Sequence, residues 1–375
     1  MKVFLTGAAG FIGSRVAEFL AESHIEVLGI DNLNSYYDPA LKIDRLVRCG
    51  FNRADMNEVF ASDRDYAESS LCAVRDVRIL RSQRFPEITF SRLDIRDRET
   101  ERLAVEFQPD VILHLAAQPG VRYSITHPEE CLDSNVMGFM RILEICRACG
   151  AKRLLYASSS SVYGEQSPHA FRESDANGAP KSVYAISKRT NEMLANVYSD
   201  LYGFKMTGLR FFSVYGEWGR PDMAPYIFTD ALLNDREITL YNGGQLSRDF
   251  TYIDDVAEAV RRIIIKGGNI FNTSPQHDVI NIGHGYPTLI TDFVALLEEL
   301  TGKEANTILL PMQHGEVHST LADSSKLHIQ FGYKPTTSLE YGLRRFINWY
   351  KDYKSIARPG VRPGVKDINS KNKFA

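Results

Sequence analysis

Three glycines at a regular spacing of three constrain the fold of this chain more than any other feature. In VFLTGAAGFIGSRVAEFL, Gly7, Gly10 and Gly13 separate an apolar run typical of a β-strand from the start of a helical pattern. Glycines permit a tight turn there, and they let a pyrophosphate approach the backbone amides at the helix N-terminus. We therefore predict a strand, a phosphate-binding turn and a helix, with Phe11 and Ile12 at the phosphate.

An acidic residue ends the next apolar run. Asp31 closes EVLGID, and a carboxylate at that point can accept hydrogen bonds from the ribose hydroxyls of an adenosine. The same charge would repel a 2′-phosphate, so the sequence favours NAD over NADP. Asp94 and Ile95 end a later run, ITFSRLDI, where they could meet the adenine.

Apolar runs typical of strands alternate with helical patterns through the first half of the chain. The runs span residues 2–6, 26–31, 88–95, 110–117, 152–159 and 204–212. This alternation predicts a parallel sheet covered by helices on both faces, an α/β fold of the Rossmann-type doubly wound class. Beyond about residue 220 the order is less regular, which predicts a smaller C-terminal α+β substrate lobe.

The same pattern gives a division into domains. We expect a nucleotide-binding domain over residues 1–220, with an insertion at about 49–85, and a substrate lobe over 221–352. The chain could pass from one lobe to the other more than once. Residues 353–375 are basic and rich in proline and glycine, which predicts a disordered tail.

The charge balance gives no reason to expect nucleic acid or an anionic membrane as a partner. The chain has 375 residues, a net charge of −3 and no apolar run of about 20 residues, the length of a membrane span. The N-terminus lacks the apolar region of a signal peptide, so we expect a cytoplasmic protein. Cys146 and Cys149 form a CxxC without a second pair or a nearby histidine, which predicts two semi-buried thiols and no metal.

A tyrosine and a lysine lie four residues apart in YAISK, at the start of a helical pattern over residues 183–201. Tyr184 and Lys188 therefore share one helical face. A free phenol has a pKa of about 10, and a neighbouring ammonium and a positive nicotinamide ring both favour its phenolate. This makes Tyr184 a candidate base.

Four consecutive serines, residues 158–161, follow the apolar run KRLLYA and contain no acid among them. Nucleophilic serine catalysis is one interpretation. The chain lacks a G-x-S-x-G turn, however, and no histidine has a clear triad context. The run instead sets neutral hydrogen-bonding groups at the end of a predicted strand.

Together, the glycine turn, the serine-ended strand and Tyr184-x-x-x-Lys188 resemble the extended short-chain dehydrogenases/reductases, in the NAD-dependent epimerase/dehydratase family. DNLNSYYDPALK, HLAAQPGVRYS, LRFFSVYGEWGRPDMA and SRDFTYIDD are similar, more narrowly, to the UDP-glucuronic acid 4-epimerases. The resemblance runs from residue 1 to about residue 350 and excludes residues 49–85.

This resemblance implies a UDP-sugar substrate, an NAD that is held tightly and not consumed, and a homodimer formed through residues 129–150 and 183–202. Tyr184 would take the proton of the sugar 4-hydroxyl while C4 passes hydride to NAD. The 4-keto sugar would rotate, and hydride would return to its other face. Ser159 would hydrogen-bond the 4-oxygen. The expected cofactor contacts are Gly7, Gly10, Phe11, Ile12, Gly13, Asp31, Asn32, Asp94, Ile95, Leu115, Ala116, Ala117, Tyr184 and Lys188.

Ser160 and Ser161 stand where related dehydratases carry Asp-Glu and related decarboxylases usually carry a glutamate. Without an acid pair, elimination lacks its general acid and base. Oxidation of glucuronate at C4 gives a β-keto acid that loses carbon dioxide readily, so an epimerase must hold that carboxylate still. Neutral donors do this, whereas a glutamate would repel the charge. We expect Ser160, Ser161 and Ser213 to form this cradle in a UDP-glucuronate 4-epimerase that produces UDP-galacturonate.

Other substrate contacts follow from position within the family motifs. Arg248 resembles the residue that binds the UDP diphosphate, Arg122 and Arg220 could face diphosphate or carboxylate, and Tyr241 sits where the family packs the uracil. His314 replaces a proline of many relatives. The alternatives are a 4-epimerase of neutral UDP-hexoses or UDP-N-acetylhexosamines, a UDP-glucuronate decarboxylase, and an NAD-binding sensor without turnover.

Overall fold

The computed structural model describes residues 1–61, 77–165, 169–175, 178–270 and 276–356. The tail predicted to be disordered, residues 353–375, is helical at its start, because residues 353–356 form the end of the helix Leu339–Ile356. The rest of the tail lies outside the described residues, as does part of the insertion at 49–85. Within the described part of the chain, no helix is both long and apolar enough to cross a membrane.

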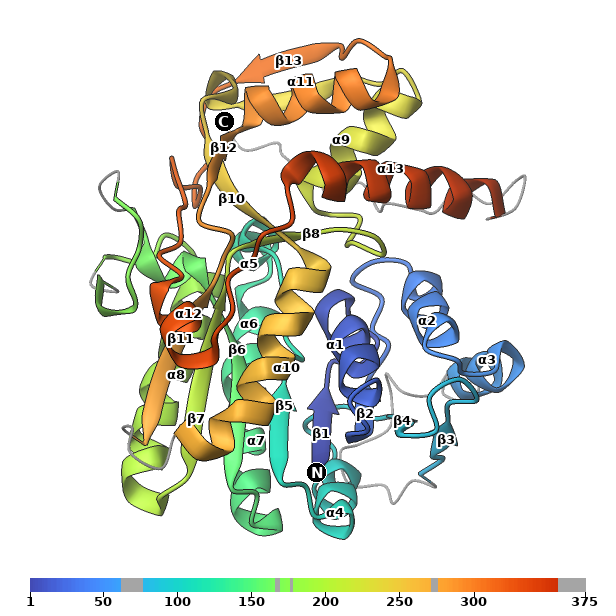
Figure 1. Cartoon of the computed structure of the whole chain (residues 1–375), viewed down its shortest axis with the longest axis vertical. Coiled ribbons are helices and arrows are strands. Elements are labelled where there is room, and N and C mark those ends of the chain that lie inside the picture. The colour runs from blue at the N-terminus through green and yellow to red at the C-terminus, as the bar shows by residue number, and fades with distance from the viewer. Residues whose placement is uncertain (62–76, 166–168, 176–177, 271–275, 357–375) are drawn as a thin grey trace.

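An eight-stranded sheet forms the centre of the molecule, in the order β11-β7-β6-β5-β1-β2-β4-β3 (Figure 1). Its strands are β1 (Lys2–Thr6), β2 (Glu26–Asp31), β3 (Leu80–Arg81), β4 (Ile88–Arg92), β5 (Val111–His114), β6 (Arg153–Ser159), β7 (Lys205–Phe211) and β11 (His277–Ile282). All neighbouring pairs run parallel except β3 and β4. The predicted doubly wound α/β fold is therefore confirmed.

Each face of this sheet has its own layer of helices. Val3 and Leu5 of β1 belong to one hydrophobic core, and Phe4 between them belongs to another. The first core includes α1 (Phe11–Ala21), α2 (Pro39–Arg48) and α10 (Ile253–Ile270), and the second includes α4 (Arg98–Phe107), α7 (Gly138–Cys149) and α8 (Val183–Tyr202). Figure 1 shows α1 and α10 side by side against the strands. Burial on both faces explains why these strands are continuously apolar.

The smaller lobe is built around a three-stranded and a two-stranded sheet. Its elements are β8 (Ser213–Tyr215), α9 (Ala224–Leu233), β9 (Ile238–Tyr241), β10 (Ser247–Tyr252), β12 (Pro287–Leu289), α11 (Ile290–Thr301), β13 (Thr307–Leu310) and α13 (Leu339–Ile356). Between them the chain returns to the large sheet, where β11 pairs with β7. The chain thus crosses between the lobes, and the domain boundary at residue 220 stays a prediction.

Short helices connect these elements. They are α3 (Arg53–Ala61), α5 (Val121–Thr126), α6 (Pro128–Leu132), the π-helix η1 (Asp133–Met137), the 3₁₀-helices η2 (Ser160–Tyr163), η3 (Glu173–Asp175) and η4 (Asn242–Gly244), and α12 (Ser325–Phe331). Of the insertion, the structure describes α3 and the edge strand β3, which lies antiparallel to β4.

Two strands end earlier than their apolar runs predict. β4 ends at Arg92 because the chain turns at Asp94, whose amide donates to Asp97 Oδ2 at 2.9 Å. β5 ends at His114, although the next amide still donates to the Thr6 carbonyl at 3.1 Å. Asp94 and residues 115–117 therefore lie in loops at the carboxyl edge of the sheet. Open α/β sheets bind their ligands at this edge.

Candidate active site

The glycine turn joins β1 to α1 at the carboxyl edge of the large sheet. Gly7 has a φ of 73°, and a Cβ there would lie 2.7 Å from the amide nitrogen of Ala116. A Cβ at Gly13 would lie 2.1 Å from the Gly7 carbonyl oxygen, to which the Gly10 amide donates at 2.9 Å. The packing of the turn therefore leaves no room for side chains at Gly7 or Gly13.

Phe11 and Ile12 open α1 directly after this turn. Gly10 is the N-cap, so no side chain from the capping residue bonds the first amides of the helix, and the first turn carries no acidic residue. The positive end of the helix dipole and its amides are thus available to an anion. This arrangement fits the pyrophosphate of NAD.

Asp31 ends β2 and is buried beside the turn. Its Oδ1 accepts a hydrogen bond from the Leu33 amide at 2.8 Å and lies 3.5 Å from Lys42 Nζ. Lys42 is itself buried, so α2 supplies the carboxylate with a counter-charge. Sequence reasoning missed Lys42, because DNLNSYYDPALK offered no pattern that separates this lysine from a surface lysine.

Asn32 and Asp94, both predicted near the adenosine, meet across the loops. The side-chain nitrogen of Asn32, Nδ2, donates to Asp94 Oδ2 at 2.9 Å. Burial acts to raise the pKa of Asp94, but hydrogen bonds from Arg96 and its positive charge outweigh burial, so the pKa is lowered. Ile95 is buried against Gly138, where a Cβ would lie 2.5 Å from Ile95 Cδ1.

The three residues after β5 leave the sheet next to the glycine turn. The Leu115 amide donates to the Thr6 carbonyl at 3.1 Å, and the Ala116 amide donates to Thr6 Oγ1 at 3.2 Å. Thr6 Oγ1 also pairs with His114 Nδ1 at 2.8 Å, and burial lowers the pKa of His114 to about 3, so the imidazole is neutral. Ala117 follows, half-buried.

Tyr184 and Lys188 share one face at the start of α8, as predicted. Ser182 caps this helix, because its hydroxyl accepts the Ala185 amide at 3.1 Å. Lys188 is 2% exposed, and its Nζ donates to the Ala157 carbonyl at 3.0 Å and lies 5.8 Å from the centre of the Tyr184 ring. Burial lowers the pKa of Lys188 to about 8.

Two predicted residues act on the Tyr184 hydroxyl. Burial raises the pKa of Tyr184, while the charge of Arg220 and a hydrogen bond with Ser159 act to lower it. Asp222 holds Arg220 by bonds of 2.9 and 2.6 Å, and the Tyr36 hydroxyl donates to Asp222 at 3.0 Å. Arg220 therefore lies at the catalytic end of the site.

The serine run divides at Ser159. Ser158 is buried, and its hydroxyl donates to Glu192 at 2.6 Å, within a buried ion pair formed with an arginine of β7. Ser159 ends β6 and caps η2, and its Oγ accepts the Ser161 amide at 3.2 Å and the Ser161 hydroxyl at 3.0 Å. Ser160 is half-buried, like Ser161. Ser158 thus faces the core, and the other three serines stay candidates for the site.

Ser213 begins β8, just beyond the end of the neighbouring strand β7. Ser159 lies opposite Phe211 in the pairing of β6 with β7. The segments that carry Ser161 and Ser213 therefore leave adjacent strand ends. That Ser160, Ser161 and Ser213 converge on one carboxylate stays a prediction.

A carboxylate that sequence reasoning missed joins two predicted substrate residues. Glu316 Oε1 pairs with Arg122 at 3.2 Å, and its Oε2 pairs with Arg248 at 2.7 Å. The Arg122 guanidinium lies 4.8 Å from the centre of the Tyr241 ring. No sequence pattern distinguished Glu316 from the other acidic residues. His314, two residues before it, is exposed.

The CxxC cysteines lie near the end of α7. Cys146 is buried and Cys149 half-buried, and burial raises the pKa of both thiols. Among the residues that the structure describes, no group of three or more His, Cys, Asp or Glu is arranged to hold a metal ion.

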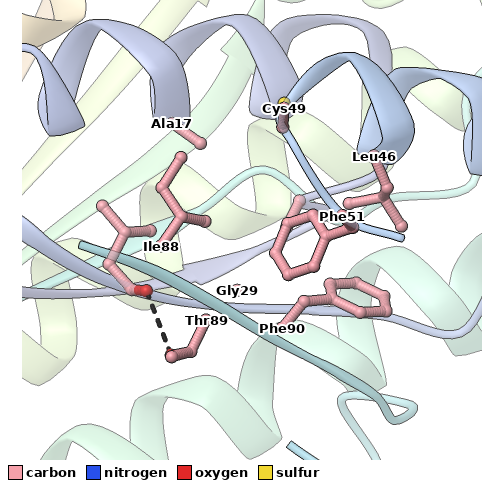
Figure 2. A pocket seen from close by; sticks show the side chains of 10 residues that line it. Ala17, Gly29, Leu46, Cys49, Phe51, Ile88, Thr89 and Phe90 are labelled. Carbon is pink, nitrogen blue, oxygen red and sulfur yellow. Dashed lines mark hydrogen bonds between the residues drawn. The ribbon is translucent and has the colours of Figure 1, made fainter. Parts of the chain in front are cut away.

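An apolar pocket lies behind the glycine turn, between α1, α2 and the strands β2 and β4 (Figure 2). Ala17, Leu46 and Phe90 contribute to its lining, and Thr89 Oγ1 donates to a strand carbonyl at 3.3 Å. Burial raises the pKa of Cys49 in this lining to about 12, so its thiol is neutral. The pocket belongs to the packing of the first core, and we assign it no ligand.

Comparison with known proteins agrees with this geometry. Residues 3–283 match the model of the NAD dependent epimerase/dehydratase family. Protein CapI of Staphylococcus aureus is 38% identical over 364 residues, which cover 94% of this chain and 99% of that protein. A probable UDP-glucuronate 4-epimerase of Rhizobium meliloti is 37% identical over 363 residues, with 93% and 97% covered.

A solved structure is similar over the same length. The UDP-glucuronic acid 4-epimerase from Bacillus cereus, in complex with UDP-glucuronic acid and NAD, has a TM-score of 0.78 and 31% identity. The match covers 94% of this chain and 100% of that one. Sequence, fold and site thus agree, and the chain belongs to the NAD-dependent epimerase/dehydratase family.

Proposed function

We propose that this protein is an NAD-dependent UDP-glucuronate 4-epimerase, which interconverts UDP-glucuronate and UDP-galacturonate. The observation that carries the proposal is the acid-free serine end of β6 beside Tyr184 and the buried Lys188, whose Nζ donates to the Ala157 carbonyl of the same strand. The names of the Rhizobium meliloti and Bacillus cereus relatives state the same activity.

The protein groups of the site handle the proton of the sugar. When bound, NAD would supply reversible hydride transfer at C4 of the sugar. Tyr184, as phenolate, accepts the 4-hydroxyl proton during oxidation and gives it back to the 4-oxygen during reduction, so the protons balance. Ser159 donates to the 4-oxygen. Because burial raises the pKa of Tyr184, the charges of Arg220 and of the nicotinamide ring are needed to favour the phenolate.

The uncharged serines favour epimerisation of the substrate over its decarboxylation. The 4-keto intermediate of glucuronate is a β-keto acid, which loses carbon dioxide readily. Its carboxylate must therefore be held in place by neutral hydrogen-bond donors. Ser160, Ser161 and Ser213 supply neutral hydroxyl donors, and no acid stands among residues 159–161 to repel the substrate.

The nucleotide end of the substrate lies with the arginines. Arg122 and Arg248 are held together by Glu316, and Arg122 stacks on Tyr241. In this proposal Arg248 binds the diphosphate, Tyr241 packs against the uracil, and Arg220 stays with Tyr184 at the sugar. The smaller lobe then supplies most of the UDP contacts.

A homodimer is part of the proposal. The outer face of α8 carries apolar side chains that the monomer leaves exposed, and the adjacent α6 and η1 extend this surface. The residues of this surface, which we call the α8 stripe, are Leu132, Met137, Ile186, Met193, Val197 and Leu201. Two copies joined along the α8 stripe would form a four-helix contact. A cytoplasmic location likewise stays a prediction.

One assay tests the function. Purified protein is incubated with UDP-glucuronate, and the products are separated by ion-exchange chromatography with carbon dioxide measured in parallel. We expect UDP-galacturonate with little UDP-pentose and no net change in NAD. UDP-glucose, assayed beside it, should be converted far more slowly. Equal efficiency on both sugars would refute the acid specificity, and UDP-pentose as main product would indicate a decarboxylase.

A further inference from the structure

The guanidinium of Arg45, on α2, joins two segments of the nucleotide site. Arg45 is fully buried. Its Nε and Nη2 donate to the Trp218 carbonyl at 3.0 and 2.7 Å, and its Nη1 donates to the Ala9 carbonyl at 3.2 Å. The Tyr37 hydroxyl accepts a further bond from Nη1 at 2.5 Å. One buried cation therefore satisfies three oxygen acceptors from three different loops.

The two carbonyls belong to segments that lie next to the start of α1. Ala9 lies inside the glycine turn, between Gly7 and Gly10. Trp218 belongs to residues 216–222, which we call the clasp and which carry Arg220 to the catalytic end. A Cβ at Gly219 would lie 3.9 Å from the ring of Phe11, so the clasp passes close to the first residue of α1.

The clasp is also fastened at its other end. Asp222 accepts a hydrogen bond from the Tyr36 hydroxyl at 3.0 Å, and Tyr36 lies in the loop that follows Asp31. The clasp therefore runs from the phosphate turn, through Trp218, to the loop at the adenosine end of β2. The two segments that the clasp contacts, the glycine turn and the loop after Asp31, are ones that we expect to bind the dinucleotide.

Trp218 adopts a backbone conformation that needs outside support. Its φ is 66°, in the left-handed region that bulky residues rarely occupy. The carbonyl is fixed by Arg45, and the ring packs against Trp349 and Tyr353 of α13, with ring centres 5.3 and 5.4 Å apart. Because Arg45 supplies both bonds to this carbonyl, the course of the clasp depends on it.

We propose that Arg45 is a positioning residue that fastens the clasp over the start of α1 and thereby keeps NAD in the protein through the reaction. The proposal rests on the proposed function in one respect. A 4-epimerase must return its hydride from the same NADH molecule. If that molecule dissociates during the reaction, the 4-keto sugar is not reduced. A buried arginine that only stabilised the fold would have no such effect on the nucleotide.

The test compares Arg45→Met with Arg153→Met. Arg153 is a matched control because it is also buried and also donates to two backbone carbonyls, of Ile263 and Ile264, both at 2.8 Å. Arg153 is the first residue of β6, so it lies at the amino end of that strand, whereas the glycine turn lies at the carboxyl edge of the sheet. Both substitutions should lower the unfolding temperature.

Only Arg45→Met should release the nucleotide. We expect NAD to dissociate at least about tenfold faster, since each lost hydrogen bond to a charged group is worth roughly a tenfold change. The measurement is the NAD remaining, by chromatography of the denatured supernatant, at intervals after desalting. Arg45→Lys keeps the charge but not the forked pair of bonds, and should release NAD at an intermediate rate. Arg45→Lys also provides the test of NAD release if Arg45→Met does not fold.

Tryptophan fluorescence reports on the conformation of the clasp independently of NAD retention. The chain has two tryptophans, Trp218 and Trp349, and both lie in this contact. Intrinsic fluorescence should therefore change in Arg45→Met and stay as in the wild type in Arg153→Met. Saturating NAD should restore much of the turnover of Arg45→Met, with a measurable KM for NAD.

Two results would overturn the proposal. One is wild-type NAD retention in Arg45→Met, or in Arg45→Lys where the former does not fold. The other is equal NAD loss in Arg153→Met, which would assign the effect to general destabilisation. Failure of the proposed function is seen separately, because nucleotide retention and fluorescence are read without any sugar substrate.

Discussion

At the scale of single residues, burial acts against the chemistry that we propose for Tyr184 and Lys188. It raises the pKa of the tyrosine and lowers that of the lysine to about 8, so each is driven toward its neutral form. A phenolate beside an ammonium thus needs further positive charge, which Arg220 and a bound nicotinamide ring supply. The site is therefore set to ionise when its cofactor is in place.

Tyr184→Phe removes the proton acceptor alone. We expect kcat to fall by roughly 10²–10⁴, the range of general base catalysis, while the fold and the bound NAD are retained. Tyr198→Phe is the control, since Tyr198 lies on the same helix but donates to Glu144 at 2.7 Å, away from the site. Near wild-type turnover in Tyr184→Phe would exclude it as the base.

Lys188 links the stability of the NAD-free protein to pH. Its pKa in the folded state, about 8, is below its ordinary value of 10.5. Below pH 8 both states carry the charge, and its burial lowers the free energy of unfolding in full. As pH rises toward 10.5 the folded state loses the proton first, so the penalty fades.

The stability of wild type relative to Lys188→Met should therefore rise between pH 7 and pH 10, by roughly 2–3 kcal/mol. The difference between the two proteins cancels the other groups that titrate in this range. Urea unfolding of nucleotide-free protein at both pH values measures it. A difference that does not vary with pH would show that the lysine is not desolvated as the structure indicates.

Ser161→Glu places a negative charge beside the proposed carboxylate cradle. We expect KM for UDP-glucuronate to rise at least about tenfold through like-charge repulsion, and more UDP-pentose and carbon dioxide per turnover. Ser161→Ala is the control, because it removes the same hydroxyl bond to Ser159 without adding charge. If both variants keep the wild-type KM, Ser161 does not face the acid.

At the scale of elements, α8 serves the site with one face and leaves another unpartnered. Lys188 lies on the buried face, whereas Met193 and Leu201 on the outer face are 64% and 67% exposed. Large apolar side chains exposed along a helix mark an interaction surface. The helix that orients the base is therefore also the candidate centre of the dimer.

Met193→Glu tests the α8 stripe. We expect wild type to have twice the chain mass of 42.3 kDa by light scattering, and the variant to shift toward the monomer because a charge cannot be buried unpaired. Ile329→Glu, at an 80% exposed position on α12, should leave the mass unchanged. A monomeric wild type, or an unaffected Met193→Glu, would contradict the proposed dimer.

At the scale of the whole molecule, we expect the large sheet to hold the cofactor and the smaller lobe to add substrate contacts. Glu316, Arg248 and Tyr241 come from the smaller lobe, while Arg122 comes from α5, which follows β5. Ligands that bridge such segments stabilise the assembly as one unit, because they bind only the folded form.

Nucleotide binding should therefore raise the unfolding temperature in a way that reports cofactor choice. NAD at a hundredfold above its Kd adds about 2.7 kcal/mol of stability to stripped protein. NADP should add less at the same concentration, since its 2′-phosphate would meet the buried Asp31. Thermal unfolding with each nucleotide measures this, and a larger shift with NADP would overturn the Asp31 interpretation.

The sequence by itself determined what depends on neighbours along the chain. The glycine turn, the strands β1 and β2 and the helix that carries Tyr184 and Lys188 agree with the structure because periodicity, turn chemistry and burial act over a few residues. The family resemblance then supplied the roles. Even here the run over 88–95 was too long, because the Asp94–Asp97 turn ends the strand against its apolar pattern.

Only the tertiary structure decided which distant side chains meet. Arg45 reaches Trp218 across 173 residues, and Glu316 reaches Arg122 across 194. Neither contact leaves a trace in local pattern, since a buried arginine and a surface arginine look alike in sequence. The strand pleat likewise turned Ser158 into the core and left Ser159 at the site, because successive side chains of a strand point to opposite faces.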